Sequence, residues 1–116
     1  MADIKFTSNV NDILSALEKG KRNALTAIGS SAETHTKDNI TADKLVDTGR
    51  LRNSISHTVD GEAAYIGTNV EYAPYLELGT KKITAHHYLK RAVTEHKNEY
   101  KKLTAQAIKT AVNNSQ

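Results

Sequence analysis

The chain has 116 residues and a formal net charge of +3, with 38% hydrophobic residues, five tyrosines, one phenylalanine and no cysteine. The missing cysteines exclude disulfide frameworks, thiolate metal sites and cysteine nucleophiles. The charge falls well short of the dense basic face of a dedicated nucleic-acid binder. The length predicts one domain spanning residues 1–116, with a thin core that gains from burying surface against further copies.

Neither a membrane span nor a signal peptide is predicted. No segment approaches the ~20 apolar residues that cross a bilayer, and the first five residues lack the charged and apolar regions of a signal peptide. We therefore expect a soluble protein with no membrane partner.

Apolar residues recur at steps of three and four between residues 8 and 36, which predicts a long amphipathic helix capped by Ser8 or Asn9. At 1.5 Å per residue this helix is about 40 Å long, which is unusual in so short a domain. Its predicted buried stripe consists of Val10, Ile13, Leu14, Leu17, Ala24, Leu25, Ile28 and Ala32.

A β-hairpin is predicted over residues 55–68, after a short helical turn at residues 48–54. Residues 55–59 alternate apolar and polar side chains, as a half-buried strand does, and residues 62–68 return along it. The intervening dipeptide, Asp60-Gly61, is typical of a tight turn with positive φ angles.

Two further helices complete the predicted layout. Pro74 suits the first turn of a short helix over residues 74–78, which Gly79 ends in the left-handed conformation. Thr84 caps a final helix over residues 85–112. The expected fold class is α+β, with two long helices packed on a small antiparallel β-sheet and the short helix between them.

The five histidines form no recognisable ligand set. They are His35, His57, His86, His87 and His96. A zinc site needs three or four ligands around one ion, and the adjacent His86 and His87 point about 100° apart on a helix. We therefore expect surface or helix-start histidines, with no metal site and no cofactor. The sequence also lacks a Gly-x-Ser-x-Gly elbow and a phosphate-binding glycine loop.

Glu71 and Glu77 form the one pair that suggests acid–base chemistry, as in a hydrolase-like accessory enzyme. No nucleophile, metal ligand or pocket is predicted beside them. Helix capping or a salt bridge between subunits is therefore the favoured interpretation, and we expect no enzymatic activity.

Basic residues are the remaining functional signal. Lysines on the last predicted helix alternate with Glu95 and Glu99, a pattern typical of a solvated face. A smaller cluster consists of Lys44, Arg50 and Arg52. If copies of the chain form a ring and this cluster faces its bore, these residues are candidates for weak, sequence-independent contact with DNA that passes through. Two alternatives stay open: the arginines pair with carboxylates of a neighbouring subunit, or the chain is a small DNA-binding module.

Three segments in chain order resemble motifs of the tail-completion, neck or head–tail joining proteins of long-tailed bacteriophages. Residues 46–55 read VDTGRLRNSI and are similar to V-D-T-G-x-L-x-x-S. Residues 66–80 read IGTNVEYAPYLELGT and are similar to V-G-T-x-x-x-Y-A-x-x-x-E-x-G-T. Residues 85–89 read AHHYL where the family usually has A-R-P-F-L, so a rigid helix start is lost and Thr84 must do more of the capping.

This resemblance, which covers residues 46–93, implies a virion structural protein at the head–tail junction that is present in the host cytoplasm before assembly. It implies a homo-oligomeric ring, expected to be a hexamer, that joins the tail to the capsid connector. The implied partners are the connector or stopper and the tail-tube or terminator proteins, and a terminator or stopper role is the alternative within the same neck. The candidate fold and assembly residues are Asp47, Thr48, Gly49, Arg50, Leu51, Tyr72, Tyr75, Glu77 and Gly79, with Lys81 and Lys82 for reaching an adjacent ring.

Overall fold

The computed structural model describes residues 6–45 and 48–114, with side chains described at 10–45 and 49–114. The elements in chain order are α1 (Phe6–Ala42), α2 (Thr48–Ser54), β1 (Ser56–Val59), β2 (Ala64–Gly67), α3 (Ala73–Leu78), α4 (Tyr88–Thr94) and α5 (Lys97–Asn114). The strands pair antiparallel, with Ser56 opposite Gly67 and Val59 opposite Ala64. The α+β class, with a long first helix and a small antiparallel sheet, is confirmed.

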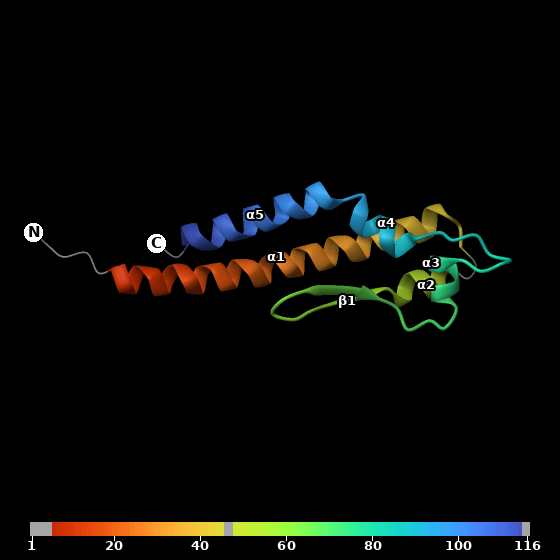
Figure 1. Ribbon diagram of the computed structural model, residues 1–116, viewed down its shortest axis with the longest axis horizontal. Coiled ribbons are helices and arrows are strands. Elements are labelled where there is room, and N and C mark those ends of the chain that lie inside the picture. Colours follow the sequence, from red (N-terminus) through yellow and green to blue (C-terminus); the bar gives the residue numbers. More distant parts are fainter. Residues whose placement is uncertain (1–5, 46–47, 115–116) are drawn as a thin grey trace, which may run out of the picture.

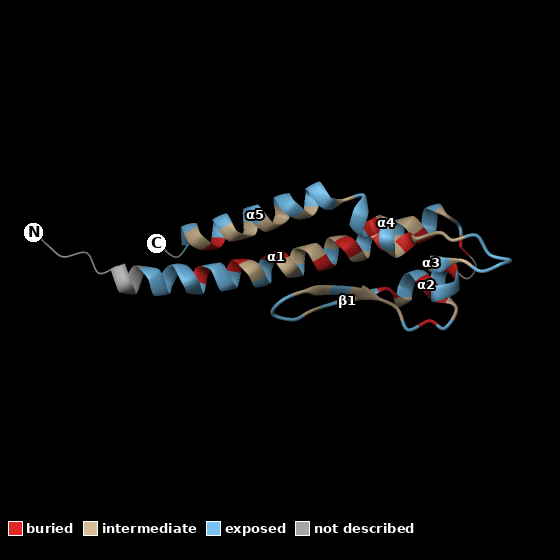
Figure 2. Cartoon of the chain, viewed as in Figure 1, coloured by how far each residue is buried: buried red, intermediate tan, exposed pale blue. Residues whose placement is uncertain are grey.

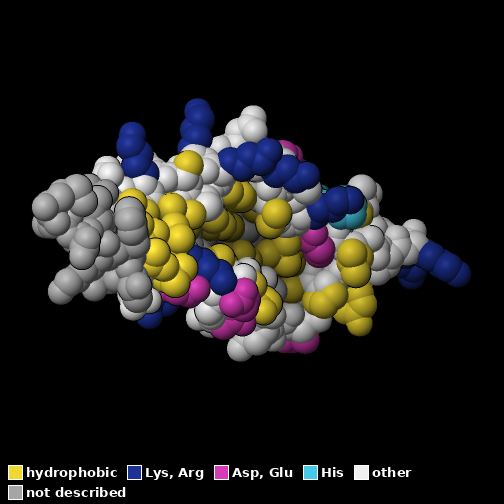
Figure 3. Space-filling model, turned by 60° about the vertical axis from the view of Figure 1, so that its left-hand side comes forward, with side chains coloured by type: hydrophobic (Ala, Val, Ile, Leu, Met, Phe, Trp, Pro, Cys, Tyr) yellow, Lys and Arg dark blue, Asp and Glu magenta, His cyan; other side chains and the backbone are white. Residues whose placement is uncertain are grey.

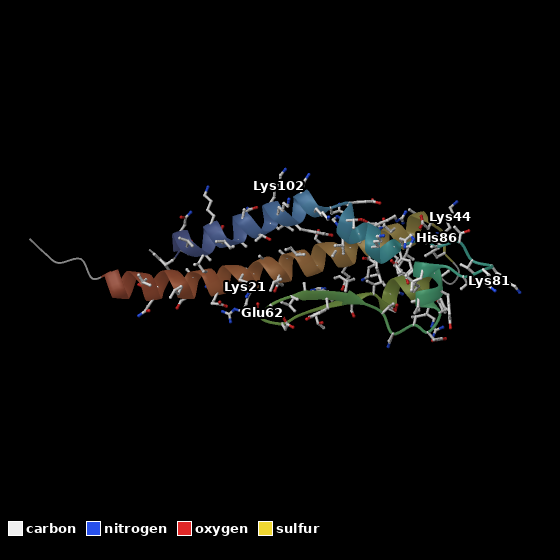
Figure 4. The ribbon with its side chains drawn as sticks, in the orientation of Figure 1. Lys21, Lys44, Glu62, Lys81, His86 and Lys102 are labelled. Carbon is white, nitrogen blue, oxygen red and sulfur yellow. The ribbon has the colours of Figure 1, made fainter. Side chains whose placement is uncertain are left out.

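The long helix α1 is the element against which the others pack. It has 37 residues, which is about 55 Å of helix, so it is longer than the predicted helix over residues 8–36. Figure 1 shows α5 along one side of α1, with the hairpin and α2 along the other. An ion pair 2.9 Å long between Lys21 Nζ and Glu62 Oε2 ties the hairpin loop to α1 (Figure 4).

The buried side of α1 is a row of mostly small residues at four-residue steps. Its fully covered members are Ala16, Gly20, Ala24, Ala32, Thr36 and Ile40. At Gly20 the helices are so close that a Cβ atom would lie 2.9 Å from the Cα of Ile108 in α5. Small side chains therefore set the distance between the two helix backbones.

The first half of the predicted buried stripe is wrong. Val10, Ile13, Leu14 and Leu17 are 39–55% exposed, and Figure 2 shows this half of α1 mostly in the colour of exposed residues. In this half α1 packs against α5 through small residues, and a close approach of backbones leaves no room for large side chains. The large apolar residues consequently lie on the outer faces of the helix.

The core lies where the C-terminal half of α1 meets α2, α3 and α4 (Figure 2). Its buried members are Ile40, Leu45, Leu51, Ile55, Val70, Ala73, Leu76 and Tyr88. The Tyr88 side chain is fully buried, and its hydroxyl donates a 2.8 Å hydrogen bond to the carbonyl of Ala73. This bond joins α4 to α3 inside the core.

The hairpin turn is a loop over residues 60–63, so the prediction of a tight Asp-Gly turn is wrong. The Asp60 carboxylate accepts hydrogen bonds from the backbone N–H groups of Glu62 and Ala63, at 2.7 and 2.8 Å. Gly61 does not adopt a positive φ. The aspartate side chain therefore turns the chain without a left-handed residue.

The helix predicted over residues 85–112 is two helices, and Thr84 does not begin either of them. The left-handed residue His87 (φ 50°) precedes α4, and residues 95–96 form a turn before α5. The Tyr100 hydroxyl donates a 2.8 Å hydrogen bond to the Ala92 carbonyl, one of those that the end of α4 leaves without a helical partner. The break lets α4 cover the core while α5 follows α1.

The contact at Gly20 predicts an unusual effect of substitution. Gly20→Ala should lower the free energy of unfolding by about 1–2 kcal/mol, because the new methyl group overlaps α5 backbone and outweighs its gain in helix propensity. Gly49→Ala in α2 is the matched control: its Cβ meets nothing within 4 Å, so stability should rise by up to about 1 kcal/mol. Denaturant unfolding measures both changes. A stabilised Gly20→Ala variant would contradict the close packing of α1 and α5.

Candidate functional site

The motif residues lie at the end of the molecule formed by α2, α3 and the loop over residues 79–87 (Figure 1). Asp47 lies outside the described residues, and Thr48 is the first residue of α2. Gly49 is exposed on α2, whereas Leu51 is completely buried in the core. Of the first motif, Leu51 therefore serves the fold and Arg50 faces the surface.

Arg50 connects the first motif to the second. Its guanidinium donates to both oxygens of Glu71, with Nη2 3.1 Å from Oε2 and Nη1 3.4 Å from Oε1. It also lies over the ring of Tyr72, 5.5 Å from the ring centre. The pKa of Glu71 is lowered. The largest cause is a hydrogen bond from the backbone N–H of Glu71 itself, and the second is the Arg50 guanidinium. Arg50 thus pairs with a carboxylate of its own chain.

Glu77 connects the second motif to the third. Its carboxylate accepts hydrogen bonds from the backbone N–H groups of Leu89, at 2.8 Å, and Lys90, at 3.1 Å. These are orphan donors in the first turn of α4, where His87 supplies no side-chain cap. Glu77 therefore caps α4. Helix capping was one of the two roles expected for Glu77, the other being a salt bridge between subunits, and Thr84 was the residue expected to cap this helix. With Glu71 held by Arg50, both glutamates of the suspected acid–base pair have structural contacts.

Gly79 ends α3 and starts the terminal loop. Its φ of 81° is positive, which glycine adopts readily. Its ψ of 168° is extended, so the expected left-handed helical conformation is not adopted. A Cβ here would lie 2.9 Å from the backbone nitrogen of Ala85. The Thr80 side-chain oxygen accepts hydrogen bonds from the backbone N–H groups of Lys82 and Ile83, which closes the loop on itself.

Lys81 and Lys82 of this closed loop are exposed, and Figure 4 shows Lys81 at the tip of the molecule. Lys44, a candidate for contact with DNA, is exposed in the turn that follows α1 (Figure 4). It has a left-handed backbone conformation, with φ of 50°. Arg52 is exposed on α2. Of the proposed DNA-contacting cluster, Arg50 is paired with Glu71 and the other two members face solvent.

A contact that sequence reasoning missed anchors the third segment to the turn that follows α1. The Asp43 carboxylate lies 3.0 Å from Arg91 Nη2 and 3.2 Å from His86 Nδ1. His86 stands where the resembling motif has arginine, so this histidine occupies a structural position. The spacing of residues 43, 86 and 91 along the chain gives no local signal for such a cluster.

Two groups of large apolar side chains remain uncovered at opposite ends of the long axis. The proximal surface consists of Val10, Ile13, Leu14 and Leu17 on α1, and the distal surface consists of Tyr75, Leu78 and Ile83. In the distal group, Tyr75 is 57% and Leu78 is 71% exposed. Figure 3 shows hydrophobic side chains gathered beside the N-terminal end. None of the helices in the described part of the chain has the length and hydropathy that a membrane crossing requires.

A family model described as "Bacteriophage HK97-gp10, putative tail-component" matches residues 4–79. The chain belongs to this family. The match spans α1, α2, the hairpin and α3, and so includes the first motif and the second as far as Gly79, but not the third. No curated protein and no solved structure matches the chain. The protein is therefore a structural component of a bacteriophage tail, which is located in the virion and interacts with other virion proteins.

Glu77 and Glu71 give a matched pair of substitutions. Glu77→Ala should lower the free energy of unfolding by about 1–2 kcal/mol, because α4 loses its only described cap on the backbone N–H groups of its first turn. Glu71→Ala should change stability little, since its ion pair with Arg50 is exposed to water. Denaturant unfolding compares the two variants, and equal losses would rule out a special role for Glu77.

Tyr88 predicts a loss of stability at high pH. Burial, followed by the negative charge of Glu77, raises the pKa of Tyr88 to about 12. The unfolded phenol ionises near pH 10, so the stabilisation is complete below pH 10 and is lost between pH 10 and 12. The loss should reach about 3 kcal/mol, because the pKa is raised by about two units. A Tyr88→Phe variant, followed by denaturant unfolding over this range, should show a smaller decline, and an identical decline would refute the assignment.

Proposed function

We propose that the protein forms a homo-oligomeric ring at the head–tail junction and joins the tail to the capsid connector. The observation that carries this proposal is the presence of two unlike apolar surfaces at opposite ends of one subunit. Membership of a tail-component family supplies the setting. Six copies per ring is the number that the sequence resemblance suggests.

The chemistry of the two surfaces favours contact between copies. The proximal surface presents aliphatic side chains on a rigid helix, and the distal surface presents Tyr75 and Leu78 from α3. Fully covering an exposed side chain of this size contributes about 1.5–3 kcal/mol. These side chains are 39–71% exposed, so each gains part of that amount and each surface favours association. Because the surfaces differ, the contact is heterologous, and a heterologous contact closes into a ring when its rotation allows.

The distal end also suggests how one ring meets its neighbours. Arg50, Glu77 and Gly79 fix α3 and its loop through contacts within the chain. Lys81 and Lys82 extend from this end and are available to carboxylates of an adjacent ring, whose proteins are the connector or stopper on one side and the tail-tube or terminator on the other. Lys44 and Arg52 remain available for weak, non-specific contact with DNA in the lumen.

Charge insertion tests the proximal-to-distal contact. Leu14→Lys and Leu78→Lys should each abolish oligomers, because a lysine cannot be buried in an apolar contact without a partner. Val93→Lys is the control, since Val93 is 48% exposed but belongs to neither surface. Native mass spectrometry and negative-stain microscopy of the pure proteins measure assembly. Full rings from either surface variant would contradict the proposed contact.

Mixing the two surface variants adds a sharper criterion. Each retains one intact surface, and the two intact surfaces are complementary, so an equimolar mixture should give a heterodimer and nothing larger. An isologous contact, in which like surfaces pair, would instead leave each variant able to pair with itself through its unmodified surface. Homodimers without heterodimers would therefore disprove the heterologous arrangement.

The position in the virion needs a separate measurement. Gold-labelled antibody against this protein should bind intact particles at the junction between capsid and tail. Label at the distal tail tip, or along the tail shaft, would refute the head–tail position while leaving the tail-component family unaffected.

A further inference from the structure

Three potential metal ligands from separate segments converge beside α1. They are His35 on α1, His96 in the turn between α4 and α5, and Glu99 in the first turn of α5. One ligand atom from each lies within 4.8 Å of the other two. The rings of His35 and His96 are stacked, with centroids 3.4 Å apart and planes 10° from parallel. Sequence reasoning gave no metal site because His35 is distant in the chain from the other two residues.

Hydrogen bonding determines which nitrogen of His35 carries the proton. The Tyr100 hydroxyl donates its proton to the Ala92 carbonyl, 2.8 Å away. Its oxygen must then accept from His35 Nδ1, which lies 3.1 Å away. A neutral His35 therefore has a lone pair on Nε2.

That lone pair faces a carboxylate. His35 Nε2 lies 3.3 Å from Glu99 Oε2, and two acceptors at this distance repel unless a positive species lies between them. The species is either a second proton on His35 or a metal ion. The geometry at this point is compatible with a metal, since two ligands about 2.0–2.1 Å from a tetrahedral zinc lie about 3.3 Å apart.

Of the other three histidine–carboxylate pairs in the described part of the chain, His87 and Glu77 are 4.0 Å apart and Glu77 accepts from backbone N–H groups of α4. The two shorter pairs have their own cations. The Glu33 carboxylate beside His57 also binds Lys37, at 3.2 Å. The Asp43 carboxylate beside His86 also binds Arg91, at 3.0 Å.

Glu99 differs from both of these carboxylates. Among the described residues it pairs with no lysine or arginine, and its further partner is the hydroxyl of Ser31, 3.1 Å away. Of the three carboxylates, Glu99 is therefore the one whose charge a bound cation would balance.

We propose that His35, His96 and Glu99 bind a divalent transition-metal ion of the zinc type. Two imidazoles and one carboxylate are a preferred ligand set for zinc, and the fourth position is open to water. The hydrogen bond from His35 Nδ1 to Tyr100 is the outer contact that metal-bound histidines usually make. A histidine nitrogen binds in the plane of its ring, so His96 turns out of the stack when the ion enters. This inference is independent of ring formation.

Zinc binding should be measured on the full-length protein without a histidine tag. Isothermal titration should show one saturable site for Zn²⁺ and no binding of Mg²⁺, which prefers oxygen ligands. Glu99→Gln and His96→Ala should each weaken zinc binding at least tenfold. Tyr100→Phe should weaken it about tenfold, since Tyr100 positions His35 without touching the ion. His57→Gln, which removes a histidine from a pair that has its own lysine, should bind as the wild type does.

Cobalt provides a second readout that does not depend on any variant being folded. Co²⁺ added to the wild-type protein should give the intense visible absorption of a four-coordinate site, and Zn²⁺ should abolish it. No saturable zinc binding, or wild-type affinity in both Glu99→Gln and His96→Ala, would overturn the proposal. A protonated His35 paired with Glu99 would then account for the contact.

Discussion

The close approach of α1 to its neighbours is the constraint on which the remaining structure depends. Most of the covered residues of α1 lie at four-residue steps from Ala16 to Ile40, with Gly29 buried in place of Ile28. Each such step turns the row by about 40° around the helix, so the row winds from one side of α1 to another. At Gly20 it faces α5, and at Ile40 it faces the core beneath α2 and α4. One helix can therefore hold two different packing partners along its length.

The motif residues act mainly as ties between segments that are distant in the sequence. Arg50 binds Glu71, Glu77 caps α4, and Asp43 binds both His86 and Arg91. Each contact crosses from one motif or helix to the next, and together they fix the end of the molecule that carries α3. Among these residues Glu77 occupies a defined position of the second motif, so that position has a structural role here, whereas Arg50 and Glu71 fill open positions of their motifs.

Periodicity and turn chemistry predicted most of the elements, but not the break between α4 and α5, the hairpin turn or the face of α1 that is buried. The hairpin, α3 and the end at Gly79 follow from local signals, because alternation, proline and glycine act over a few residues. The apolar residues at 10–17 satisfy the helical period, yet the row at 16, 20 and 24 is the one that is buried. Which face of a helix is covered depends on the element that packs against it. The sequence of α1 alone does not show that small residues of α5 pack against it, so it could not predict the buried face.

The candidate site residues likewise fall into those that the sequence identified and those that only the fold brings together. The sequence identified Arg50, Glu77 and Gly79, because each belongs to a motif with defined spacing. It did not identify the group formed by His35, His96 and Glu99, because the turn at residues 95–96 brings the start of α5 back against α1. That turn interrupts what reads as one continuous helix, and the interruption has no proline or glycine to mark it.

Within the described part of the chain, this arrangement leaves apolar surface exposed at both ends of the monomer. The small residues that let α1 and α5 approach also exclude Leu14 and Leu17 from the space between them. Exposed aliphatic groups of this kind favour association over isolation. At the other end, the ties around α3 hold Tyr75 and Leu78 in place before any partner arrives, which reduces the ordering cost of binding. The same packing that stabilises the subunit therefore leaves it with surfaces suited to assembly.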